Sequence, residues 1–183
     1  MFSKKNIPNF LTVFRIFLIP SIIISVEIGN SKYYWVALIL YILACFSDFF
    51  DGYFARKFDL ESNFGKFLDP IADKILVVSI IIVLIANNQI SGIFVYPALI
   101  IILREIIVSG LRDFFLHSSH TLLVTKLAKW KTLLQMSSLG FLIVHQNFDT
   151  KFILYFGNFG LSLASIITIY TGYIYFKKNL KLF

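Results

Sequence analysis

Long apolar runs alternate with short polar breaks along the whole chain. Each run holds roughly 20 residues, which is the length that an α-helix needs to cross a bilayer. The runs are rich in Leu, Ile and Phe and lack the alternation of period two that marks a membrane β-barrel. We therefore predict an all-α, polytopic membrane protein. Its six transmembrane helices are expected at about 9–28, 33–54, 64–86, 93–115, 128–144 and 152–176.

The composition supports this fold class. Hydrophobic residues make up 58% of the 183 residues and charged residues 15%, whereas soluble domains average about 45–50% and about 25%. The first apolar run has no small-residue cleavage site, so we expect a membrane span there rather than a signal peptide. The single cysteine, Cys45, excludes an internal disulfide and a zinc–cysteine cluster. We expect one membrane domain over residues 1–183.

The cationic residues are distributed unevenly between the two predicted membrane faces. Six spans place both termini on one side, and only Lys32 and Lys151 fall on the other. By the positive-inside rule the basic side is cytoplasmic. The net charge of +7 then reflects topology and anionic lipid rather than nucleic acid. The cations on the basic side are Lys4, Lys5, Arg56, Lys57, Lys66, Arg112, Lys126, Lys129, Lys131, Lys177, Lys178 and Lys181.

Four of the seven aspartates lie where the second predicted span ends and the third begins. Asp48 and Asp51 are three residues apart, and Asp69 and Asp73 are four apart, so each pair shares one helix face. The polar stretch 57–64 connects the two spans. We therefore expect the four carboxylates to converge at the cytoplasmic membrane interface, which is the predicted active site.

Three interpretations of this acidic cluster are open. It could form a structural ion-pair network with Arg56, Lys66 and Lys74. It could belong to a cation or proton pathway, because carboxylates within spans also mark transporters. It could bind two divalent metal ions for phosphoryl chemistry, in which the metals neutralise a pyrophosphate. Oxygen ligands favour magnesium, manganese or calcium over zinc.

Basic residues form a second constellation. Arg104 lies about two turns inside the fourth span, and Arg112 follows eight residues later. Lysines at the start of a helix oppose its macrodipole, so Lys129 and Lys131 suggest an anionic partner. The partner is either bulk anionic lipid or a substrate phosphate in a pocket made by these four residues. Neighbouring side chains on a helix diverge, so we expect Glu105 not to face Arg104.

Arg15 lies inside the first apolar run and has two interpretations. An arginine one or two turns from the interface can extend its guanidinium to water. Alternatively, its charge faces the acidic cluster or a lipid phosphate. Position alone does not choose between them.

The acidic stretch resembles a known signature. It fits D-x-x-D-G-x-x-A-R, eight residues, then G-x-x-x-D-x-x-x-D, and every fixed position is filled. This pattern is similar to that of the CDP-alcohol phosphotransferases, integral membrane enzymes of phospholipid synthesis. The resemblance implies that Asp69 and Asp73 are catalytic, with Asp73 as general base. It implies two Mg²⁺ or Mn²⁺ ions on Asp48, Asp51, Asp69 and Asp73. It assigns the CDP-lipid to Asp48, Asp51, Gly52, Ala55, Arg56 and Gly65.

Three further stretches narrow the resemblance to the phosphatidylglycerophosphate synthases within that family. They are Asn-Ile-Pro-Asn-x-Leu-Thr-x-x-Arg ending at Arg15, Arg-Glu-Ile-Ile-Val-Ser-Gly-Leu-Arg ending at Arg112, and Lys-Trp-Lys-Thr-x-x-Gln-Met ending at Met136. Ala128 and Ser109 depart from the glycine and threonine common there. The final span carries no diagnostic residue.

This narrower resemblance implies an enzyme of the bacterial inner membrane, commonly homodimeric. Its reaction moves the phosphatidyl group of CDP-diacylglycerol to glycerol 3-phosphate. The acceptor phosphate would bind Arg104, Arg112, Lys129 and Lys131. Two alternatives stay open: the same chemistry with serine or inositol phosphate as acceptor, or a divalent-cation transporter.

Overall fold

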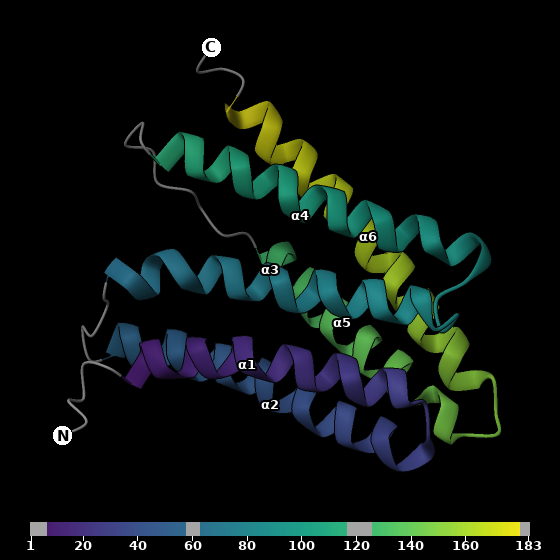
Figure 1. Cartoon of the computed structure of the whole chain (residues 1–183). Coiled ribbons are helices and arrows are strands. Elements are labelled where there is room, and N and C mark those ends of the chain that lie inside the picture. Colours follow the sequence, from purple (N-terminus) through teal and green to yellow (C-terminus); the bar gives the residue numbers. More distant parts are fainter. Residues whose placement is uncertain (1–6, 58–62, 117–125, 180–183) are drawn as a thin grey trace. The chain divides into compact units, whose positions relative to one another are not determined.

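A computed structural model describes residues 7–57, 63–116 and 126–179. Side chains at some helical positions, among them 51–57 and 111–116, lie outside the description. All the regular secondary structure in the described residues is helical, which confirms the predicted all-α class (Figure 1). The elements are α1 (Ile7–Ile28), α2 (Ser31–Lys57), α3 (Asn63–Ala86), η2 (Gly92–Phe94), α4 (Val95–Leu116), α5 (Lys126–Val144), η3 (His145–Asn147) and α6 (Phe152–Asn179).

The helices fall into two compact units. The first comprises Met1–Gln89 with Ile143–Asp149, and the second comprises Ile90–Leu142 with Thr150–Phe183. Each unit carries one of the two polar constellations found in the sequence, the aspartates in the first and the basic residues in the second. The expectation of a single domain over the whole chain stays a prediction.

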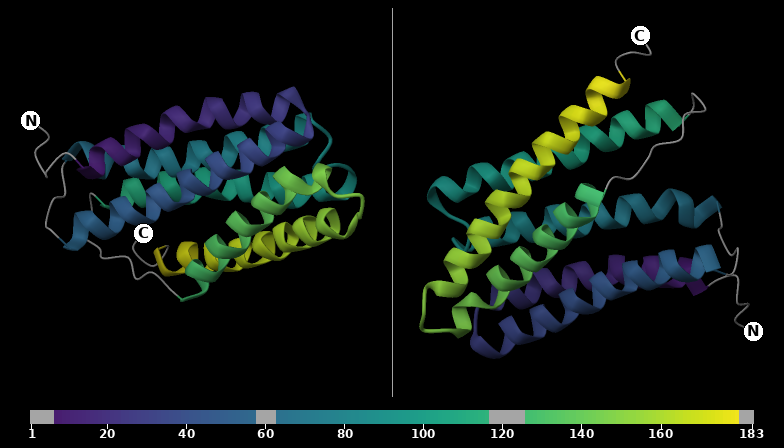
Figure 2. Two further views of the ribbon diagram at one scale, coloured as in Figure 1. Left: turned by 90° about the horizontal axis from the view of Figure 1, so that it is seen from below. Right: turned by 180° about the vertical axis from the view of Figure 1, so that it is seen from behind.

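In the first unit, α1 packs against both α2 and α3 (Figures 1 and 2). Gly29 makes the tight connection from α1 to α2 with a φ of +69°, a conformation that glycine adopts without steric cost. The core includes the fully buried Ile22 of α1 and the small Ala37 and Ala44 of α2. Small residues let membrane helices approach closely, so α1 is well placed to contact side chains from both neighbours.

In the second unit, α4 packs against α6, and α6 also meets α5 (Figure 2). A β-carbon on Gly157 would lie 2.8 Å from Leu142 Cγ, so these two helices are in close contact. Phe141 and Phe156 add an edge-to-face ring pair at 5.1 Å. The buried polar residues of this unit are Lys131, Gln135, Ser138, Asn158, Ser165 and Thr168.

Among the described residues, three helical segments are long and apolar enough to cross a membrane: Phe10–Ile28, Gly92–Gly110 and Phe152–Ile174. By comparison, α3 carries Asp69, Asp73 and Lys74 in its first half. Large apolar side chains are exposed on all six α-helices, for example Phe17, Phe67 and Phe152. Exposed apolar side chains in such number are typical of contact with lipid. The chain is therefore a membrane protein by its helices and its surface.

Candidate active site

The acidic residues of α2 and α3 meet on one face of α1. Arg15 of α1 forms an ion pair with Asp48 of α2 at 2.9 Å and a second ion pair with Asp73 of α3. One turn earlier on α1, the hydroxyl of Thr12 donates a hydrogen bond to Asp69 of α3. Two side chains of α1 thus bind three of the four predicted carboxylates, and the acidic helices converge as the sequence predicted.

Helix periodicity explains this arrangement. Thr12 and Arg15 are three residues apart and Asp69 and Asp73 are four apart, so each pair occupies one helix face. The two faces oppose each other where α1 packs on α3. On the α2 side, the Ser47 hydroxyl donates to the backbone carbonyl of Leu11 at 3.0 Å and fixes the position next to Asp48.

Burial differs sharply across these ion pairs. The Arg15 side chain is 0% exposed, whereas the Asp48 and Asp73 side chains are 40% and 44% exposed. A buried guanidinium needs anionic partners, because an unpaired buried charge is strongly destabilising. Arg15 therefore faces the acidic cluster, which settles the choice that its position in the sequence left open. The structural ion-pair network considered from the sequence used Arg56, Lys66 and Lys74, and it did not include Arg15.

The donor chemistry fits a divalent cation. Three carboxylates against one guanidinium leave a formal charge of minus two, and two of the carboxylates are accessible from outside the protein. The contacts to α1 named above are made by Oδ1 of each carboxylate, and a carboxylate has about four acceptor sites. No group of three acidic, histidine or cysteine side chains is already arranged as a metal site among those that the structure describes. The fourth predicted ligand, Asp51, falls outside them.

The other residues predicted for the CDP-lipid are on the same two helices. Gly65 is buried near the start of α3. Asp51, Gly52, Ala55 and Arg56 lie on the last two turns of α2, and their side chains are outside the described residues. Their roles stay predictions.

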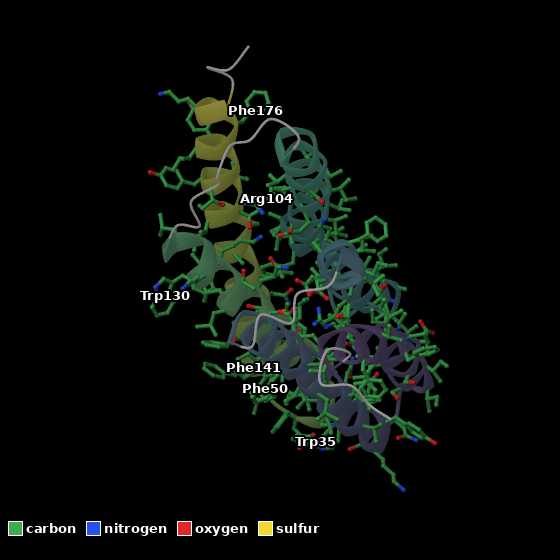
Figure 3. All side chains as sticks on the ribbon, turned by 90° about the vertical axis from the view of Figure 1, so that its left-hand side faces the viewer. Trp35, Phe50, Arg104, Trp130, Phe141 and Phe176 are labelled. Atoms are coloured by element: carbon green, nitrogen blue, oxygen red, sulfur yellow. The ribbon has the colours of Figure 1, made fainter. Side chains whose placement is uncertain are left out.

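The second constellation is centred on an acidic residue. Glu105 Oε1 lies 3.5 Å from Arg104 Nη1 and also forms an ion pair with Lys131 of α5. The other terminal nitrogen of Arg104, Nη2, donates a hydrogen bond to the hydroxyl of Thr171 on α6 at 3.3 Å. Figure 3 shows Arg104 between the ribbons of α4 and α6. The expectation that Glu105 does not face Arg104 was therefore wrong, because both side chains are long enough to bend towards each other.

The four cations predicted to bind phosphate are not equivalent. Arg104 and Lys131 share Glu105, and the Lys131 side chain is only 6% exposed. Lys129, two residues earlier on α5, is exposed. The neighbouring Trp130 also projects away from the helices in Figure 3. The side chain of Arg112 lies outside the described residues.

Sequence reasoning missed Thr12, Glu105 and Thr171 as site residues. Thr12 stands in the same short motif as Arg15 and shares its helix face, which was a usable signal. Glu105 directly follows Arg104 in the sequence, which was a signal of charge balance. For Thr171 the sequence gives no signal, because its contact depends on how α4 packs against α6.

Residues 5–172 match the model of the CDP-alcohol phosphatidyltransferase family, and the chain belongs to this family. Members generally use divalent metal ions. The chain is 43% identical over 180 residues to the CDP-diacylglycerol–glycerol-3-phosphate 3-phosphatidyltransferase of Rickettsia felis, covering 98% of both chains. Identically named proteins are similar in Haemophilus influenzae (38%, covering 93% of this chain and 87% of the other) and in Bacillus subtilis (35%, covering 95% of each).

Proposed function

We propose that the chain transfers the phosphatidyl group of CDP-diacylglycerol to glycerol 3-phosphate, giving phosphatidylglycerophosphate and CMP. The observation that carries this proposal is the convergence of Asp48, Asp69 and Asp73 on Arg15 and Thr12. It gathers carboxylates from two helices at one place. The similarity to proteins named for this reaction, over almost the whole chain, supports the choice of substrates.

The proposed metal ligands are Asp48, Asp51, Asp69 and Asp73. Two Mg²⁺ or Mn²⁺ ions bound there would neutralise the pyrophosphate of the CDP-lipid and stabilise the oxygens that attack and leave. Arg15 offsets part of the negative charge of these carboxylates while no cation is bound. Gly52, Ala55, Arg56 and Gly65 are proposed to contact the cytidine nucleotide, with the two glycines allowing it close to the backbone.

The proposed reaction is a direct displacement. Asp73 accepts the proton of the acceptor hydroxyl, which requires a distance of roughly 2.6–3.2 Å between them. The hydroxyl oxygen bonds to the phosphorus that bears diacylglycerol. The bond from that phosphorus to the bridging oxygen breaks, and CMP leaves with the electron pair. Asp69 lies one turn from Asp73 and holds its place through Thr12.

The acceptor phosphate is proposed to bind the basic residues of the second unit. Arg104 and Lys131 are held together by Glu105, and we add Arg112 and Lys129 from the sequence resemblance. An acceptor without a phosphate, such as serine with its single carboxylate, would use less of this concentration of charge. A phosphate provides the paired anionic oxygens that arginine and lysine bind best.

We also propose six membrane crossings, one for each long helix, with both termini and the acidic cluster at the cytoplasmic face of the bacterial inner membrane. The excess of cations on that side supports the orientation. A homodimer is proposed from the sequence resemblance alone. Accessibility labelling of cysteines introduced in the predicted loops would test the topology.

Product analysis tests the function. Purified protein is given CDP-diacylglycerol with glycerol 3-phosphate, inositol phosphate or serine, with and without a chelator. We expect CMP and phosphatidylglycerophosphate only with glycerol 3-phosphate and a divalent ion. CMP release with serine instead would assign another acceptor. Metal flux in proteoliposomes without CMP release would assign a transporter.

A further inference from the structure

Glu105 occupies the centre of the cation pair that is proposed to bind the acceptor phosphate. A single oxygen, Oε1, contacts both the Arg104 guanidinium and the Lys131 ammonium. This inference rests on the proposed function, because it concerns how the same site selects its acceptor.

The surroundings make an anion at this place necessary. The Lys131 side chain is 6% exposed and the Arg104 side chain 19%, and both lie on apolar helices. Cations held in such surroundings are costly unless an anion pairs with them. Glu105 meets that requirement in the free protein, and its carboxylate is the group that a bound phosphate would resemble.

Glu105 is also able to leave. Its side chain is 20% exposed, so the carboxylate has access to solvent without unfolding of α4. Arg104 has an independent anchor in the Thr171 hydroxyl, so the guanidinium keeps its place when Glu105 moves. Arg104 can therefore exchange one anion for another while its own position is preserved.

We propose that Glu105 is a specificity-determining residue: it is the internal anion of the Arg104–Lys131 pair and yields that place to the acceptor phosphate. A phosphate carries up to two negative charges and several acceptor oxygens, so it competes with one carboxylate oxygen. An acceptor with a neutral group has nothing to offer the cations in exchange. A phosphate-bearing acceptor can therefore take the place of Glu105 on the cations, and an acceptor without an anionic group cannot.

The first test removes the charge of Glu105 while keeping its shape. In Glu105→Gln, without an anion to displace, we expect inorganic phosphate to bind about tenfold more tightly. The KM for glycerol 3-phosphate should fall while the KM for CDP-diacylglycerol is unchanged. The preference for glycerol 3-phosphate over unphosphorylated glycerol should also widen, because glycerol has no anionic group that gains from the freed cations. Phosphate binding is measured by thermal shift without CDP-lipid, so the readout does not depend on turnover.

Two further variants sharpen the test. Glu27→Gln removes an exposed carboxylate that accepts from Asn87 in the first unit, and it should leave phosphate binding unchanged. Glu105→Asp keeps the charge but shortens the side chain, so phosphate affinity should rise by a smaller factor than in Glu105→Gln. If Glu105→Gln does not fold, the phosphate affinity of Glu105→Asp tests the proposal instead.

The inference and the proposed function fail in different ways. If the wild-type protein makes no product from glycerol 3-phosphate, the proposed function is wrong. If the wild type is active and phosphate binds the Glu105 variants equally well or more weakly, Glu105 only holds Lys131 in place and this inference is overturned. A lower KM for CDP-diacylglycerol in Glu105→Gln would also contradict it, because the effect would not be specific to the acceptor.

Discussion

Arg15 Nη1 lies 2.9 Å from Asp48 Oδ1 and joins α1 to α2. The same nitrogen pairs with Asp73 Oδ1, which joins α1 to α3. One fully buried guanidinium therefore links the two acidic helices, and the accessible carboxylates are held close together before any substrate binds. This relationship makes α1 part of the architecture of the proposed active site.

Replacement of Arg15 should therefore damage the geometry of the site. In Arg15→Gln the side chain still fills space but loses its charge, and we expect kcat/KM to fall on the order of 100-fold, because small misplacements of reacting groups cost about that much. Arg15→Lys keeps the charge with a single nitrogen and should recover part of the activity. CMP release measures both variants.

Unfolding measurements on the same variants separate the role of Arg15 in positioning the carboxylates from its role in folding. Lys32→Gln removes an exposed cation at the start of α2 and serves as the control for loss of positive charge. Thermal unfolding in detergent should show Arg15→Gln less stable than Lys32→Gln. Wild-type kcat/KM in Arg15→Gln would mean that the carboxylates keep their arrangement without Arg15.

Asp73→Asn tests the proposed general base. An amide cannot accept the proton of the acceptor hydroxyl, so turnover should fall by about 10²–10⁴-fold. Binding of CDP-diacylglycerol should be largely kept, because Asp48, Asp51 and Asp69 remain. Equilibrium binding and CMP release on the same preparation measure the two effects. Asp149→Asn, at an exposed turn, is the matched control, and full activity of Asp73→Asn would exclude the base.

The sequence predicted the helices, and it predicted that Asp48, Asp69 and Asp73 come together. Apolar runs of sufficient length, broken by polar turns, determine where helices begin and end, and the spacing of Asp69 and Asp73 determines that they share a face. It could not predict that Asp69 binds Thr12 while Asp73 binds Arg15. That pairing depends on the register between α1 and α3, which the packing of whole helix faces determines.

The contacts of the basic residues could not be predicted from the sequence for the same reason. Charge type and helix position singled out Arg104 and Lys131, which the structure joins through Glu105. The rule that adjacent residues diverge on a helix describes Cβ directions, and it failed for Arg104 and Glu105 because both have several rotatable bonds. The shared contact with Lys131 comes from α5, 26 residues further along the chain, and no local pattern in the sequence reports it.

Lys131 and Lys129 should differ in their effect on the acceptor. Lys131→Ala removes a buried cation that contacts Glu105, and we expect the KM for glycerol 3-phosphate to rise about tenfold or more, since charge-assisted contacts to phosphate are strong. Lys129→Ala removes an exposed charge on the same helix and should have a small effect. Steady-state kinetics with each substrate varied in turn gives both constants.

The change in KM for glycerol 3-phosphate relative to the change in KM for CDP-diacylglycerol decides this prediction. The KM for CDP-diacylglycerol should change little in Lys131→Ala, and Lys151→Ala, at another exposed lysine, controls for general loss of charge. Equal losses for both substrates would argue against a phosphate pocket at Lys131. A larger effect of Lys129→Ala than of Lys131→Ala would place the pocket elsewhere on α5.

The contact between α5 and α6 leaves no room for a side chain at Gly157. A β-carbon there would lie 2.8 Å from Leu142 Cγ and 3.3 Å from the backbone oxygen of Ser138. Leu142 is fully buried, so Gly157→Ala should destabilise the protein by about 1–3 kcal/mol, as overpacking of a filled core does. Gly110→Ala is the matched control on α4, because no described atom lies within 4 Å of a β-carbon at that position and alanine favours a helix over glycine by about 0.8–1.0 kcal/mol. Thermal unfolding in detergent compares the two variants with the wild type, and equal stability of both would mean that α5 and α6 are free to separate at this contact.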